Sequence, residues 1–260
     1  MSDFRDDFDG PELDRAVWLP HYLPAWSSRA DTAAGLRLAD SCLTLDVPVD
    51  HPVWCPGDHV PPIRVSGIQS GSFSGPVGSA HGQQPFREGQ LVREEQPRFE
   101  GWLPRSGRVE VRCRMELSPR SMAALWLSGF EDDRERQQCG ELCVVEVFGR
   151  SADGASAEVG LGVKPFRDPR LTDDFAAPRL PIDVAQFHDY AVDWDADEAV
   201  FSVDGEPVRR CPRPPTYPLQ VMLAVFDFPE WSVGGDDDLV PELVVDRIIG
   251  SDRPRFGRRY

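Results

Sequence analysis

One short stretch, residues 140–149, constrains the fold more than any other part of the chain. Its residues are mostly apolar and glycines bound it, so the pattern predicts a buried β-strand. It also carries two glutamates, Glu141 and Glu146. Burying a carboxylate costs free energy, and packing gives a core strand no reason to keep either residue. The stretch therefore predicts a core strand whose acidic side chains lie on the face that points away from the core.

The spacing of the two glutamates predicts an irregularity in this strand. Side chains alternate between the two faces of a strand, so Glu141 and Cys143 share one face and Leu142 occupies the other. Glu146 has the parity of Leu142 unless one residue is extra. A β-bulge supplies that residue, and bulges are common beside active sites. Leu142 and Val147 then point into a core, while Glu141, Cys143 and Glu146 line a groove.

Two carboxylates on one groove wall suit the hydrolysis of glycosides. The Cα atoms of Glu141 and Glu146 would lie about 13–16 Å apart at roughly 3.3 Å per residue. Their side chains must therefore lean together to approach the carboxyl separation of about 5–5.5 Å that a retaining mechanism uses. The alternative is a pair of exposed glutamates on an edge strand.

The rest of the chain also favours strands. Residues 108–115 alternate between polar and apolar side chains, whereas residues 122–127 and 219–226 are almost wholly apolar. Residues 199–208 predict a hairpin around an Asp-Gly turn. The 25 prolines and 22 glycines favour many turns over long helices. A chain of 260 residues suffices for one large all-β domain.

The least regular region, residues 48–105, predicts loops that frame the cleft and one strand. Long loops inside compact domains are often binding loops. Arg64 in this region is a candidate sugar-binding residue, although nothing in its spacing fixes that role. The aromatic residues 21–26 predict either a loop over one end of the groove or a packed surface loop.

The motif Glu141-Leu142-Cys143-Val144-Val145-Glu146 resembles the active-site strand of glycoside hydrolase family 16, which includes the laminarinase-like β-glucanases. That family has Glu, a hydrophobic residue, Asp, a hydrophobic residue, one extra residue and Glu. Further segments match in the same order: residues 6–14, 107–114, 124–127, 187–194 and 201–205. The resemblance implies a concanavalin A-like jelly roll, a β-sandwich of two stacked antiparallel sheets with a concave groove, as a single domain over residues 1–260.

The resemblance also implies the chemistry. Glu141 would be the nucleophile and Glu146 the acid/base of a retaining, endo-acting hydrolase of β-linked glucan or a related polysaccharide. Cys143 is the third candidate catalytic-site residue, and it stands where the family has Asp. Its neutral thiol removes a charge and a hydrogen-bonding partner from the site.

Two tryptophans are candidate substrate-binding residues by the same resemblance. Trp126 matches a ring that lies beneath a sugar, although a core tryptophan is the alternative. Trp231 matches the aromatic residue near the cleaved bond. Met222 stands where the family usually has Asn, so one sugar contact is expected to be missing.

The resemblance implies no required cofactor, but a structural calcium often binds between the opening segment and the last strand. Asp7 and Asp246 occupy the matching places, and oxygen ligands suit calcium. A strongly acidic chain also carries such residues without a ligand.

Net charge limits the partners. The formal charge of −16 argues against nucleic acid, whose phosphates would be repelled. The expected partner is a polysaccharide or oligosaccharide, and we expect a monomer. No apolar run is long enough to span a membrane. No signal peptide is visible, so we expect a cytoplasmic protein with reduced thiols, or a secreted one if the true N-terminus lies upstream.

Three functions fit these patterns. The intact glutamate pair favours a hydrolase. A transglycosylase differs only in how well an acceptor sugar outcompetes water. Cys143, Met222 and the missing signal peptide favour a catalytically weak or inactive carbohydrate-binding protein on the same fold.

Overall fold

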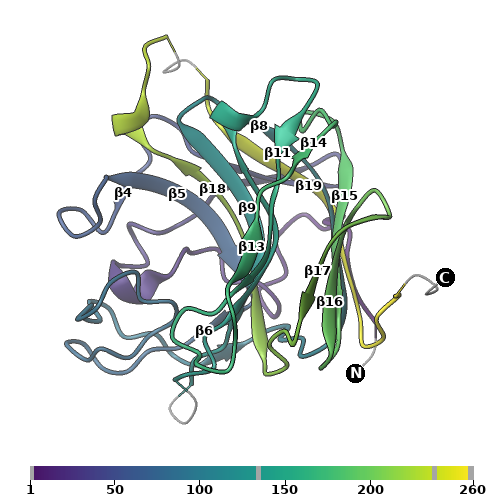
Figure 1. The fold of residues 1–260 in the computed structure, drawn as a ribbon. Coiled ribbons are helices and arrows are strands. Elements are labelled where there is room, and N and C mark those ends of the chain that lie inside the picture. Colours follow the sequence, from purple (N-terminus) through teal and green to yellow (C-terminus); the bar gives the residue numbers. More distant parts are fainter. Residues whose placement is uncertain (1–2, 133–135, 236–238, 257–260) are drawn as a thin grey trace.

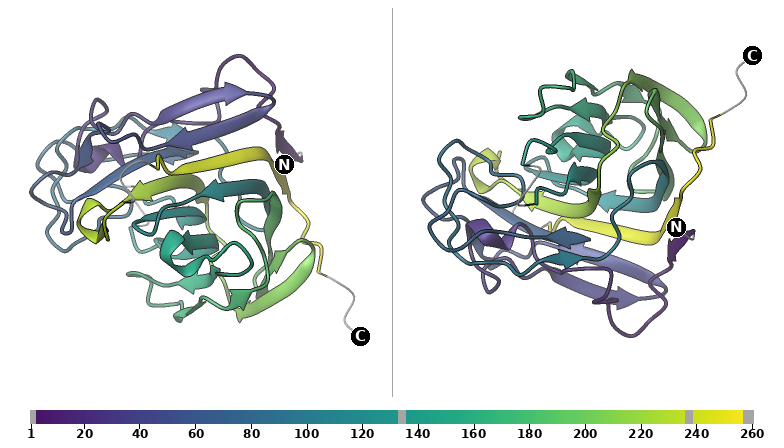
Figure 2. Two further views of the ribbon diagram at one scale, coloured as in Figure 1. Left: turned by 90° about the horizontal axis from the view of Figure 1, so that it is seen from above. Right: turned by 90° about the horizontal axis from the view of Figure 1, so that it is seen from below.

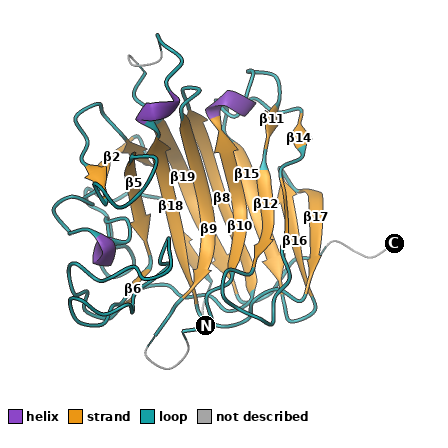
Figure 3. Ribbon diagram, turned by 60° about the vertical axis from the view of Figure 1, so that its left-hand side comes forward, coloured by secondary structure: helices purple, strands orange, loops and turns teal. Residues whose placement is uncertain are grey.

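A computed structural model describes residues 3–132, 136–235 and 239–256. Two large antiparallel sheets stack face to face, and the only helical elements in these residues are three short turns (Figures 1 and 3). These turns are η1 (Pro24–Trp26), η2 (Gly149–Ser151) and η3 (Pro229–Trp231). The architecture is the jelly-roll β-sandwich that the strand pattern and the resemblance predict. None of the helices in the described residues has the length and apolar character needed to cross a membrane.

The outer sheet has eight strands within the described residues, and its order is not sequential. Along the sheet they run β17 (Glu206–Pro212), β16 (Glu198–Val203), β15 (His188–Trp194), β8 (Gly107–Glu116), β19 (Glu242–Ser251), β3 (Cys42–Asp46) and β2 (Gly35–Ala39). The eighth strand, β1 (Phe4–Asp6), pairs with β19, so the described ends of the chain meet there (Figure 2).

The inner sheet has seven strands in the same residues and carries the groove. Its order is β13 (Asp174–Ala176), β12 (Gly160–Lys164), β10 (Glu141–Phe148), β9 (Ser121–Gly129), β18 (Leu219–Asp227), β5 (Ile63–Gln69) and β4 (Val53–Trp54). Two strand pairs lie outside both sheets: β11 (Ala157–Glu158) with β14 (Arg179–Leu180), and β6 (Gly71–Ser72) with β7 (Phe99–Glu100).

The main core fills the space between the two sheets. Along β8, residues 109, 111, 113 and 115 are buried and the residues between them are partly exposed, which confirms the predicted wet and dry faces. Strands β9, β10 and β18 send every second side chain into this core, for example Leu125, Val147 and Leu223. Burial of these apolar side chains is the main force that holds the sheets together.

The opposite face of the inner sheet is also covered, and this explains why β9 and β18 are apolar throughout. Their other side chains, including Trp126 and Met222, join a second hydrophobic cluster with Trp54 from the irregular region and Trp26 from the aromatic segment 21–26. The Trp26 indole is fully buried and donates to the Gln83 carbonyl at 2.7 Å. The irregular region therefore builds a cap on one part of the concave face, and β5 is the longest strand in it.

Candidate active site

A β-bulge in β10 sets the geometry of the site. Against β9 the register shifts between Cys143 and Val145, and against β12 it shifts between Cys143 and Glu146. Val144 and Val145 consequently both point into the core between the sheets. The predicted bulge is confirmed, and it returns Glu146 to the face that Glu141 and Cys143 share.

These three side chains line a cavity of about 280 Å³ on the concave face. Aromatic rings make up much of its wall, and Tyr22 from the segment before η1 contributes one of them. Flat apolar rings beside a few polar groups are a surface on which sugars stack. The other lining aromatic residues are Trp54, Phe86, Trp126, Phe166, Phe226 and Phe228.

Lys164, at the end of β12, connects the two glutamates. Its Nζ lies 3.7 Å from Glu141 Oε1 and 3.3 Å from Glu146 Oε2. Those two oxygens can therefore be no farther apart than the sum of these distances, about 7.0 Å. The two long side chains do lean together, as a shared catalytic role requires.

Burial dominates the electrostatics of Glu141, which is 5% exposed. Loss of solvation raises the pKa of this carboxyl to about 7, and the nearby charge of Glu146 adds to the shift. Lys164 and a hydrogen bond from Gln84 oppose it. Glu141 therefore changes charge near neutral pH.

Gln84 is a site residue that the sequence analysis missed. Its Nε2 donates to Glu141 Oε2 and its Oε1 accepts from Trp126 Nε1, both at 3.2 Å. Its backbone N–H donates to Glu131 Oε1 at 2.9 Å, and Glu131 is paired with Arg167. Gln84 also has a left-handed φ of 42°, a conformation that costs free energy and that clusters at functional sites. No spacing signal marks it, because it lies in the irregular region.

Cys143 is a neutral thiol in this environment. It is fully buried, and burial, with the charges of both glutamates, raises its pKa well above the ordinary thiol value. Its Sγ donates to the carbonyl of Gly160 at 3.7 Å. The middle position of the motif therefore supplies no charge to the pair.

The candidate sugar-binding residues lie in three different settings. Trp126 lines the cavity. Trp231 lies in η3 outside the lining set, but it stacks on the lining residue Phe228 with ring centroids 4.1 Å apart. Arg64 is not among the lining residues and pairs with Asp227 at 3.1 Å. The structure therefore brings Trp126 to the glutamates, extends the aromatic surface to Trp231, and leaves Arg64 in an ion pair.

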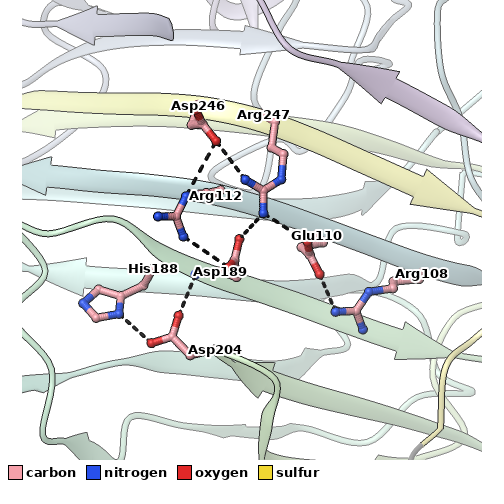
Figure 4. A network of polar contacts seen from close by, with 8 residues as sticks. All are labelled: Arg108, Glu110, Arg112, His188, Asp189, Asp204, Asp246 and Arg247. Atoms are coloured by element: carbon pink, nitrogen blue, oxygen red, sulfur yellow. Dashed lines mark hydrogen bonds and ion pairs between the residues drawn. The ribbon is translucent and has the colours of Figure 1, made fainter. Parts of the chain in front are cut away.

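The two candidate calcium ligands are paired with arginines. Asp7 accepts from Arg5 at 2.6 Å. Asp246 contacts Arg247 at 2.8 Å and Arg112 at 3.6 Å, within the network on the outer sheet in Figure 4. Within the described residues no group of three or more His, Cys, Asp or Glu side chains is arranged to hold a metal ion. These paired side chains do not form the cage of six to eight oxygens that calcium takes, so calcium binding stays a prediction.

The structure is thus a jelly-roll β-sandwich whose groove brings two carboxylates together across a bulge, among aromatic rings. The model of glycosyl hydrolases family 16 matches residues 104–236, and the chain belongs to this family. No curated protein sequence matches the chain.

Solved structures share the fold over nearly the whole chain. The GlcNAcα1-4Gal-releasing endo-β-galactosidase from Clostridium perfringens aligns with a TM-score of 0.78 at 23% identity, over 98% of this chain and 63% of that chain. This chain thus spans less than two thirds of that protein's length. The endo-1,3-β-glucanase (laminarinase) catalytic domain from Thermotoga petrophila aligns with a TM-score of 0.66 at 16% identity, over 96% of both chains. These neighbours show that the chain shares the fold of solved glycosidases.

Proposed function

We propose that the chain is a retaining, endo-acting glycoside hydrolase that cleaves a β-linked polysaccharide. Glu141 attacks the anomeric carbon and the glycosidic C–O bond breaks, while Glu146 transfers its proton to the leaving oxygen. Glu146 then takes a proton from water, and the water oxygen displaces Glu141 from the anomeric carbon. The configuration of the sugar is retained because it is inverted twice.

One observation carries this proposal: a single ammonium group contacts both glutamates on the groove face. The resulting limit of about 7.0 Å between the two contacting oxygens includes the separation of about 5–5.5 Å typical of retaining enzymes. Most of the range of about 6.5–9.5 Å typical of inverting enzymes lies above this limit, which supports the retaining mechanism.

The substrate class that we favour is a neutral β-linked glucan or galactose-containing glycan. The wall of the cavity is rich in rings, which suits the apolar faces of sugars. The similarity to an endo-β-galactosidase, at the higher TM-score of the two neighbours described, makes galactosides as strong a candidate as glucans.

The first experiment measures reducing-end release at high enzyme concentration. The panel contains β-1,3-glucan, mixed-linkage β-1,3-1,4-glucan, agarose and a β-galactoside-containing glycan. We expect release from one of them, loss of release in Glu141→Gln and Glu146→Gln, and no change in Glu206→Gln, which alters an exposed glutamate on β17. Unchanged release in both site variants would refute the assignment, and an inverted anomer in the first product would refute the retaining mechanism.

A carbohydrate-binding protein is the second candidate, and the neutral thiol of Cys143 favours it. In that case no glycan is cleaved, while one of them raises the melting temperature through binding to the native state. A transglycosylase uses the same pair and would instead release products longer than the substrate.

A further inference from the structure

The chain has 28 lysine and arginine residues in total, and Lys164 is the single lysine among them. The two residue types are not interchangeable. Arginine carries a wide planar fork, whereas lysine carries a compact charge with three donors on a flexible stem. The one ammonium side chain of the protein thus lies between the two glutamates that we assign to catalysis.

Two glycines open the path for this side chain. Leu161 and Val163 of β12 point into the core between the sheets, so Gly160, Gly162 and Lys164 share the groove face. In the register of the sheet, Gly160 pairs with Glu146 and Lys164 pairs with Glu141. Because glycines occupy the two preceding positions on this face, no side chain of β12 lies in front of Lys164. Its stem can therefore extend along the strand from Glu141 toward Glu146.

A side chain at Gly160 would close this path. A Cβ atom there would lie 3.2 Å from Glu146 Cβ and 2.7 Å from Cζ of Phe175 on β13. The Phe175 ring is itself part of the arrangement, because Lys164 Nζ lies 4.2 Å from its centroid. A cation at this distance from a ring face is attracted by it. Phe175 thus holds the ammonium from the side opposite the glutamates' strand.

The surroundings keep Lys164 charged. Burial by itself lowers the pKa of Lys164, but the charges of Glu141 and Glu146 outweigh that effect and the pKa is raised. The neutral Cys143 thiol adds no charge between the two glutamates.

The other titratable groups that line this cavity are Tyr22, His59, Cys139 and the ion-paired Glu131 and Arg167. In the part of the chain that the structure describes, the ion pairs of Lys164 are with Glu141 and Glu146.

We propose that Lys164 is a positioning residue that fixes the two glutamates relative to each other. Its ammonium group, 3.7 Å from Glu141 Oε1, also opposes the effect of burial on that carboxyl. The proposal rests on the proposed function. In this proposal Lys164 on β12 connects the two glutamates of β10. The uncharged Cys143 between them does not.

The kinetic test compares Lys164→Met with Lys164→Arg. The Met variant keeps the length of the stem and removes the charge, so the acid limb of kcat/KM should move up by about one pH unit, giving about tenfold loss below the limb and much less above it. The Arg variant keeps the charge and should keep the limb near its original place. Equal loss at every pH in the Met variant, with an unmoved limb, would overturn the proposal.

A second test needs no activity, because the protein has one ε-amino group. Reductive methylation with ¹³C-formaldehyde preserves the charge and gives a single side-chain NMR resonance, which the Lys164→Arg variant identifies by its absence. The α-amino signal is distinguished by its lower pKa. We expect the Lys164 resonance to titrate at lower pH in Glu141→Gln and in Glu146→Gln than in the wild type.

An unchanged titration in both glutamine variants would overturn the proposal even if the protein cleaves a glycan. If Lys164 titrates at lower pH in the glutamine variants but no glycan is cleaved, the contacts of Lys164 with the two glutamates are supported and the proposed function is refuted instead. The two failures are therefore distinguishable.

Discussion

Replacing Glu141 with glutamine should stabilise the protein at alkaline pH. The folded state raises the pKa of this carboxyl from its ordinary 4.5 to about 7, chiefly through burial. Ionisation of Glu141 therefore costs the folded state more than the unfolded state. The contribution of Glu141 to the free energy of unfolding is therefore most favourable below pH 4.5, and this advantage is lost as the pH rises through 7.

The size of the effect follows from the shift. At about 1.4 kcal/mol for each pKa unit, the rise from 4.5 to about 7 is worth on the order of 3 kcal/mol. Glutamine resembles the protonated carboxyl and does not ionise. For a domain of this size, a gain of that order raises Tm by roughly 5–10 °C.

Thermal unfolding of both proteins between pH 4 and pH 8.5 measures this difference. We expect Tm values that nearly coincide at pH 4 and diverge in favour of Glu141→Gln as the pH rises. The exposed Glu206→Gln variant should show no such divergence, since water solvates that side chain in both states. A difference that is independent of pH, or a wild type more stable at pH 8.5, would refute the assignment of a buried, destabilised carboxylate.

Three further changes test other parts of the structure. Insertion of an alanine between Val144 and Val145 reverses the parity of the residues that follow and turns Glu146 toward the core, so glycan cleavage should disappear and urea unfolding should show a clear loss of stability. An insertion variant that cleaves normally would contradict the bulge argument. Cys143→Asp adds a negative charge beside Glu141 and should move the acid limb of kcat/KM upward by about one unit, whereas a limb that moves downward would show that the charge has no such effect. Arg120→Met removes the buried partner 2.7 Å from Asp227 and should cost about 3 kcal/mol in urea unfolding, against less than about 1 kcal/mol for the exposed Arg179→Met.

Much of the fold is encoded locally, and the sequence predicted it. Alternation in residues 108–115 and the apolar residues 122–127 correspond to β8 and β9, because the period of side chains in a strand is set by the backbone itself. The bulge was predictable for the same reason, since two glutamates of opposite parity on a buried strand are costly unless one extra residue brings them to one face.

The partners of the glutamates were not encoded locally. Gln84 reaches Glu141 from 57 positions away, out of a loop without periodicity. Arg64, a candidate sugar-binding residue, pairs with Asp227, which lies 163 positions away.

The sequence by itself thus determined the strands, the bulge and the side of the sheet on which Glu141 and Glu146 lie. Only the tertiary structure decided that Lys164 and Gln84 contact them. The physical reason is that strand parity depends on neighbouring residues, whereas contacts between distant segments depend on the strand register and the loop closure that the packed core imposes.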